Sequence, residues 1–234
     1  MTSLLADISN QVALRFVPAD HDGWGSQMED GQATISWGDC RHPSASLAHE
    51  LLHLRLQLRG YKRMRIVISN IDAPETNKRL LGAIDNEIQH HKFYPDFLGA
   101  GFKPHQFYMD SDADTERFLD GEMDSGPHTA ASVAIIFLSL VAPGGSLTDS
   151  VKSRLRDRLD TRESGTYKPM LGNIERILSE WTVSPEADAT AHIKKLLLAI
   201  KPNDNLTWYG FRATDRPPDV GVFVDERFAV QETS

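Results

Sequence analysis

The sequence has a single cysteine and no apolar run long enough to cross a membrane. Cys40 alone cannot form an internal disulfide bond. The longest apolar stretch, residues 130–142, contains two serines and is shorter than the roughly 20 residues that a spanning helix needs. The first residues lack the basic start and long apolar run of a signal peptide. These absences predict a protein of the reducing cytoplasm with no membrane partner.

Basic residues are also scarce. The chain of 234 residues carries 25 Lys and Arg against 33 Asp and Glu, so its formal net charge is -8. Binding to a phosphate backbone depends on Lys and Arg, so this charge argues against a nucleic-acid partner. A small basic cluster at Arg55, Arg59 and residues 62–65 is predicted to be a solvated face. The length suits one large domain or two small ones.

The pattern His-Glu-x-x-His occurs once, at His49, Glu50 and His53. Pro43 suits the start of a helix and Gly60 suits the position just past its end. On such a helix the two histidines lie one turn apart on the same face. Two neutral imidazoles at this spacing can hold one zinc ion, and the glutamate between them can activate a water molecule.

The same helix has an apolar stripe on the side that faces away from the histidines. This stripe consists of Leu47, Leu51, Leu54 and Leu58. Since Leu52 and Leu56 flank the histidines, the helix is apolar around most of its circumference and is predicted to be buried. A buried polar group without a partner costs about 1–3 kcal/mol, so the imidazoles need partners.

A second helix is predicted over residues 75–94, and Pro95 is expected to end it. One of its faces carries Leu80, Ile84, Glu87, His91 and Tyr94. A glutamate on an apolar face is unusual unless it is paired with a charge or a metal. Glu87 is therefore predicted to be the third metal ligand. His91 is the next choice and His90 the last.

The strand, turn and His-Glu-x-x-His helix within residues 33–58 resemble zinc peptidases of the zincin type. In the gluzincin branch the third ligand is a Glu on a downstream helix, often preceded by Asn or Asp, and Asn86-Glu87 resembles that signature. The family commonly has an Asp one turn later, where this chain has residues 89–91, Gln-His-His. The resemblance implies that His91 or Asn86 contacts the zinc ligands, not the ion itself, and holds them in position.

The resemblance also implies a substrate cleft beside a strand edge, near Ser36 and Trp37, although core packing is preferred for Trp37. A group that stabilises the oxyanion is expected as well. Its candidates are His90, Tyr94, His128, Tyr167 and Tyr209. Cys40 could act as a latch on the zinc ion, but a small buried residue in a turn is preferred.

The expected fold is α+β and mostly helical, with a small sheet packed on the central helix and a helical C-terminal half. Strands are predicted at residues 12–17 and 33–37, with a loop at 18–31. A linker at 121–127 divides a zincin-like core, residues 1–125, from a helical region, residues 126–234, unless the two form one continuous domain. This region ends in a predicted strand pair, made of residues 206–211 and 220–224.

Three functions fit these features. The first is a cytoplasmic zinc metallopeptidase, a hydrolase of peptide or protein substrates with Glu50 as general base. The second is a non-catalytic, zincin-like module that binds metal or a partner. The third is a zinc hydrolase of a non-peptide amide. A purely structural metal site has no need for Glu50, so this residue favours an enzyme.

Overall fold

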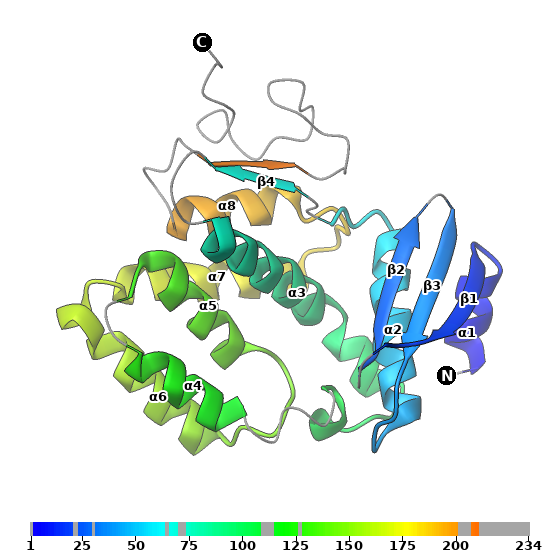
Figure 1. Cartoon of the computed structure of the whole chain (residues 1–234), viewed down its shortest axis with the longest axis horizontal. Helices are drawn as coiled ribbons and strands as arrows, with labels where there is room; N and C mark the ends of the chain where they lie inside the picture. Colours follow the sequence, from blue (N-terminus) through cyan, green and yellow to red (C-terminus); the bar gives the residue numbers. More distant parts are fainter. Residues whose placement is uncertain are drawn as a thin grey trace, which may run out of the picture.

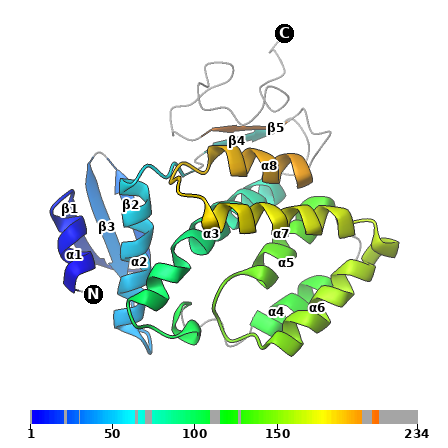
Figure 2. The same ribbon diagram turned by 180° about the vertical axis from the view of Figure 1, so that it is seen from behind.

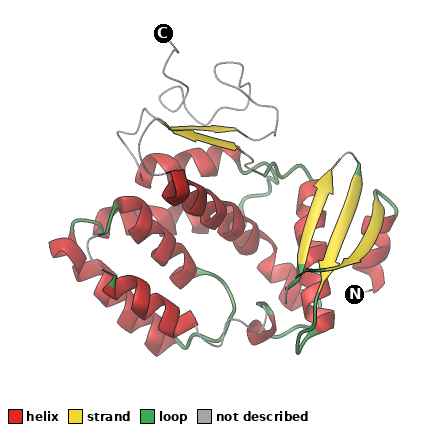
Figure 3. Cartoon of the chain, in the orientation of Figure 1, coloured by secondary structure: helices red, strands yellow, loops and turns green. Residues whose placement is uncertain are grey.

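The computed structural model describes residues 2–20, 23–29, 31–63, 66–69, 74–108, 115–125, 128–200 and 207–210. Helices dominate, and a small sheet lies at one side of the molecule (Figures 1 and 3). The α+β, mostly helical class predicted from the sequence is thus confirmed. Among the described residues, no helix combines the length and apolar character needed to cross a membrane.

The main sheet has three strands in the order β1-β3-β2. β1 (Ala13–Pro18) runs parallel to β3 (Gln32–Trp37), whereas β2 (Gly25–Glu29) runs antiparallel to β3. The two outer strands of this order are β1 and β2, so β2 forms one edge. The prediction of a loop at residues 18–31 is wrong for β2. Met28 is the only large apolar residue of β2, so its sequence lacks the alternation that marks a half-buried strand.

The central helix α2 (Pro43–Leu58) lies between two hydrophobic cores. On one side it packs on the sheet and on α1 (Thr2–Ser9), with Leu51 and Leu54 completely buried. This contact confirms the apolar stripe that the sequence predicts. On the other side, its small and apolar residues join the larger helical core. The helix is held from both sides, so its polar residues have fixed positions.

The second long helix, α3, extends from Pro74 to Gly99 and continues through Pro95. The prediction that Pro95 ends it is wrong. Proline removes one backbone hydrogen bond, but burial of the next turn compensates for this loss. Phe97 is completely buried and its ring stacks on Phe102, with the ring centroids 5.0 Å apart.

The C-terminal half is an assembly of helices, of which α5, α7 and α8 pack on α3 (Figure 2). It contains η1 (Pro104–Gln106), α4 (Thr115–Asp124), α5 (Ala130–Val141), α6 (Asp149–Thr161), η3 (Arg162–Gly165), α7 (Lys168–Val183) and α8 (Thr190–Ile200). α4 continues to Asp124, so the first part of the predicted linker is helical. One core cluster contains residues from Ala45 to Ile200. This shared core favours the continuous-domain alternative over a boundary after residue 125.

A short antiparallel pair joins two distant segments, β4 (Ile66–Ser69) and β5 (Thr207–Gly210). The sequence predicts instead that residues 206–211 pair with residues 220–224. The structure pairs β5 with β4, which lies about 140 residues earlier in the chain, a separation that local pattern does not reveal. Residues 220–224 lie outside the described residues.

The burial of Leu51 predicts a large loss of stability on its truncation. Leu51→Ala should lower the free energy of unfolding by about 2–5 kcal/mol, because it leaves a cavity between α2 and the sheet. Leu98→Ala is the matched control, since Leu98 is 38% exposed on α3 and its loss should change stability by no more than about 0.5 kcal/mol. Urea unfolding followed by circular dichroism measures both. Equal effects of the two substitutions would contradict the packing of α2.

Candidate metal centre

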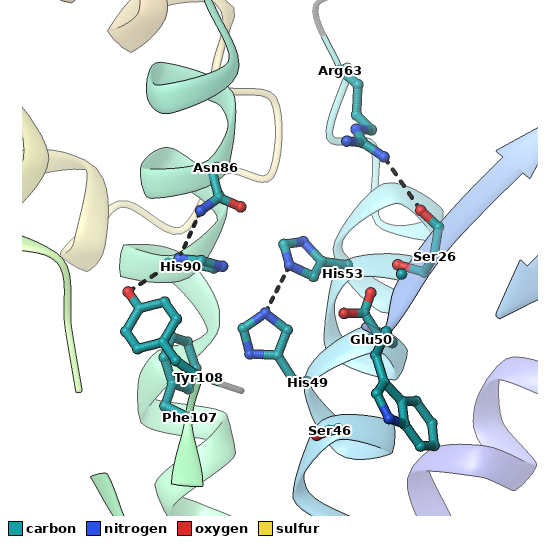
Figure 4. A pocket seen from close by; sticks show the side chains of 12 residues that line it. Ser26, Ser46, His49, Glu50, His53, Arg63, Asn86, His90, Phe107 and Tyr108 are labelled. Carbon is teal, nitrogen blue, oxygen red and sulfur yellow. Dashed lines mark hydrogen bonds between the residues drawn. The ribbon is translucent and has the colours of Figure 1, made fainter. Parts of the chain in front are cut away.

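Three histidines from two neighbouring helices meet where α2 packs on α3. His49 and His53 come from α2, and His90 comes from α3. One ring nitrogen of each lies within 4.8 Å of the other two. Figure 4 shows His90 across the cavity from the two α2 imidazoles. Within the described part of the chain, this is the group of side chains close enough to hold a metal ion.

The nitrogens of this group suit a metal ion. The Nε2 atoms of His49 and His53 face each other at 3.1 Å. Two imidazole nitrogens bound to one tetrahedral zinc ion lie about 3.3 Å apart, since each Zn–N distance is about 2.0–2.1 Å. Nε2 of His90 is buried and has no hydrogen-bond partner. A cation between the three rings would satisfy this nitrogen, so the residues fit the metal that the sequence pattern implies.

Aromatic rings pack around the three imidazoles. Phe107 lies 4.7 Å from His49 between ring centroids, and Phe93 lies 4.7 Å from His53. Tyr108 lies 5.3 Å from His90. These contacts restrict the rotation of each ring and exclude water from its faces.

Burial also keeps the α2 histidines uncharged. It lowers the pKa of His53 to about 3, with the nearby His90 as a second cause. Burial lowers the pKa of His49 well below its ordinary value, and the nearby His53 and His90 lower it further. Both imidazoles are therefore neutral at pH 7, the form in which histidine binds a metal ion.

A chain of hydrogen bonds sets the orientation of His53. Its Nδ1 lies 2.9 Å from Oε1 of Gln89, and the Gln89 amide group donates to the Asp85 carboxylate at 3.0 Å. Asp85 also accepts hydrogen bonds from the Tyr61 hydroxyl at 2.8 Å and from Nε of Arg63 at 3.2 Å. Since Gln89 offers its oxygen to Nδ1, that nitrogen carries the proton. The lone pair of Nε2 then faces the other histidines.

The opposite nitrogen of His90 is surrounded by polar groups. Its Nδ1 lies 3.3 Å from the Tyr108 hydroxyl, 3.4 Å from the Asn86 amide and 3.5 Å from the Glu87 carboxylate. The Asn86 amide also donates to Glu87 at 3.2 Å. Glu87 thus lies behind His90, where it can orient the ring, and is not a member of the three-residue group.

Of the three residues considered as third ligand, His90 is the one that the structure brings close to the histidines of α2. α3 presents Gln89, His90 and Phe93 to the histidines of α2. Glu87 lies on a different side of α3 and lines a second cavity of about 270 Å³. His91 is likewise absent from the group. The apolar pattern of α3 does not reveal which side packs on α2, because the helix is buried on more than one side.

Glu50 lies in the same cavity as the histidines. This cavity has a volume of about 310 Å³ and is lined by Trp24, Gly25, Ser26, Ser46, His49, Glu50, His53, Arg63, Asn86, His90, Phe107 and Tyr108. Burial raises the pKa of Glu50, while a hydrogen bond with the Ser26 side chain counteracts part of that increase. A carboxylate with a raised pKa accepts a proton more readily, as a general base must.

The strand beside the cavity is β2 and not β3. Gly25 and Ser26 of β2 line the cavity, whereas Ser36 and Trp37 of β3 do not. Gly25 is the cross-strand partner of Ser36, so the cavity lies one strand away from the expected position, and a substrate cleft there stays a prediction. β3 is the middle strand and both of its edges are paired. The side chain of Trp37 is exposed, which also excludes the preferred core role.

Several other candidates lie elsewhere. The Cys40 thiol contacts the Ser46 hydroxyl at 3.4 Å and does not line the cavity, so a latch role has no support. Tyr94 packs on the far side of Phe107, and Tyr167 donates a hydrogen bond to the backbone of His128. Tyr94, Tyr167 and His128, three of the oxyanion candidates, do not line the cavity. The side chain of another candidate, Tyr209, lies outside the described part of the structure.

Sequence reasoning missed several cavity residues, among them Tyr108 and Arg63. Tyr108 follows η1 in a segment without periodic pattern, and no sequence signal marks it. Arg63 belongs to the basic cluster that was predicted to be a solvated face, but its guanidinium group lies at the cavity wall. Residues of loops reach a site through tertiary packing, which periodicity does not encode.

Comparisons with protein-family models, with curated proteins and with solved structures gave no match for this chain.

Replacement of His90 should abolish tight metal binding, whereas replacement of Glu87 should not. His90→Ala removes one of three nitrogens and should weaken zinc binding by more than the roughly 10- to 100-fold that loss of a supporting partner causes. Glu87→Gln preserves shape and should retain zinc at a stoichiometry near one. Competition with a chromogenic chelator measures both affinities. Loss of zinc from the Glu87 variant alone would contradict the ligand set.

Replacement of Gln89 tests the chain of hydrogen bonds. Gln89→Leu leaves Nδ1 of His53 without its partner and should lower zinc affinity about 10- to 100-fold. Gln11→Leu is the control, because Gln11 is exposed just past the end of α1 and its side chain donates hydrogen bonds to Asp7, away from the cavity lining. Unchanged zinc affinity in the Gln89 variant would show that this partner does not orient the ring.

Proposed function

We propose that the protein is a zinc-dependent hydrolase of amide bonds that acts on peptides. The observation that carries this proposal is the meeting of His49, His53 and His90 beside Glu50 in one cavity. Three protein ligands leave a fourth position open, which is typical of catalytic zinc sites, whereas structural sites usually have four protein ligands.

Zinc is the metal that these ligands favour. Imidazole nitrogens suit several divalent ions, but a compact set of three on two packed helices fits tetrahedral coordination best. When bound, the ion supplies Lewis acidity, which polarises a carbonyl group and acidifies a water molecule. Every other part of the chemistry belongs to side chains of this protein.

Glu50 is the proposed general base. It takes a proton from the attacking water and transfers it to the nitrogen of the leaving amine. Its burial and raised pKa support this role, because the carboxyl group then holds the proton long enough to deliver it. The hydrogen bond with Ser26 keeps the carboxylate in place near the imidazoles.

The position of β2 supports a peptide substrate. β2 is an edge strand, and Gly25 and Ser26 at its start line the cavity. An extended peptide can add to such an edge through backbone hydrogen bonds. The zincin resemblance implies the same placement of substrate. The single cysteine further favours a reducing compartment, so we place the activity in the cytoplasm.

A second candidate is hydrolysis of a small, non-peptide amide. The cavity volume of about 310 Å³ favours it, since this is near the lower end of the range for ligand sites. A short peptide also fits that volume. The non-catalytic alternative gives no reason for Glu50 to lie beside the histidines.

Glu50→Gln tests the proposed chemistry. The variant should keep zinc in full but hydrolyse a peptide library about 10²- to 10⁴-fold more slowly, because the amide cannot accept the water proton. Glu186→Gln is the control, since Glu186 is exposed and far from the cavity lining. Mass spectrometry of the digested library measures cleavage. Equal rates in the Glu50 variant and the parent would remove Glu50 from the mechanism.

A further inference from the structure

Arg63 is a cation at the wall of the proposed catalytic cavity. It follows the end of α2, and its side chain is 35% exposed. Figure 4 shows Arg63 at one end of the cavity and Ser46 at the other, with Glu50 between them. The proposed chemistry at Glu50 does not use this guanidinium group.

Two hydrogen bonds hold the Arg63 side chain in position. Its Nε donates to the Asp85 carboxylate at 3.2 Å, and its Nη1 donates to the Ser26 backbone carbonyl at 3.4 Å. Asp85 is itself buried and held by Tyr61 and Gln89. A guanidinium group has five N–H donors, so these contacts leave three without a partner in the described residues. The group is thus positioned in advance, and donors remain for a ligand.

Arg63 is the positively charged side chain among the described residues that line the cavity. Among the described residues that line it, Glu50 is the one acidic group, and it already receives the Ser26 hydrogen bond. Asp85 balances Arg63 from behind, outside the cavity lining. The planar fork of an arginine matches the two oxygens of a carboxylate.

We propose that Arg63 binds a carboxylate group of the substrate, so that the protein hydrolyses short amide substrates whose free carboxylate lies near the scissile bond. This inference rests on the proposed function and specifies its substrate class. With the amide carbon held near Glu50, a carboxylate a few bonds away extends along the cavity to Arg63. The small cavity volume agrees with such a compact, anionic substrate.

The test uses two dipeptide hydroxamates that are identical except that one ends in a free carboxylate and the other in a carboxamide. Titration calorimetry measures their affinities for the zinc-loaded, full-length protein. The carboxylate compound should bind about 10- to 100-fold more tightly, the gain expected for charged hydrogen bonds. Arg63→Gln should remove this preference without changing the affinity for the carboxamide, and Arg63→Lys should keep part of it.

Arg59→Gln is the matched control, because it removes one exposed positive charge outside the cavity and should keep the full preference. Equal affinities of the two hydroxamates for the parent protein would overturn the carboxylate inference and leave the zinc hydrolase intact. Failure of both compounds to bind the zinc-loaded protein would contradict the proposed function itself. An equal loss for both compounds in Arg63→Gln would assign Arg63 to the oxyanion or to folding, and would also overturn the inference.

Discussion

The close packing of α2 on α3 is the constraint on which this structure depends. It brings three imidazoles together beneath packed aromatic rings, with one ring nitrogen of each within 4.8 Å of the other two. Such an arrangement is unfavourable without a cation, since each buried polar atom that lacks a partner costs about 1–3 kcal/mol. Nε2 of His90 is in this state. A metal ion between the three rings would give this nitrogen a partner.

The rest of the molecule holds this interface in place. The sheet and α1 support α2 from one side, and the helical core that contains α5, α7 and α8 supports α3 from the other. Trp181 of α7 donates a hydrogen bond from its indole nitrogen to the Ile88 carbonyl at 2.6 Å, two residues before His90. Gly144, with a φ of 78°, lets the loop after α5 lie against Phe107 and so fixes the segment that covers His49. The C-terminal half thus holds α3 and Phe107 in position around the histidines.

The sequence was sufficient to predict the first half of the site. The 3.6-residue period places His49 and His53 on one face, and the leucine stripe on the opposite face predicts where α2 packs. It was not sufficient to find the third histidine of the cluster, because α3 is buried on several sides and only tertiary packing decides that His90, and not Glu87, faces α2. The prediction that Pro95 ends α3 failed for a related reason. Burial of Phe97 outweighs the hydrogen bond that proline removes.

The central claim is that His49, His53 and His90 together bind one zinc ion. X-ray absorption spectroscopy at the zinc edge of the stoichiometrically loaded protein tests it most directly. The account predicts three imidazole nitrogens at about 2.0–2.1 Å, with the outer-shell scattering of three rings and one further light ligand. A first shell with only two imidazoles and a carboxylate, or one with four protein ligands, would contradict it.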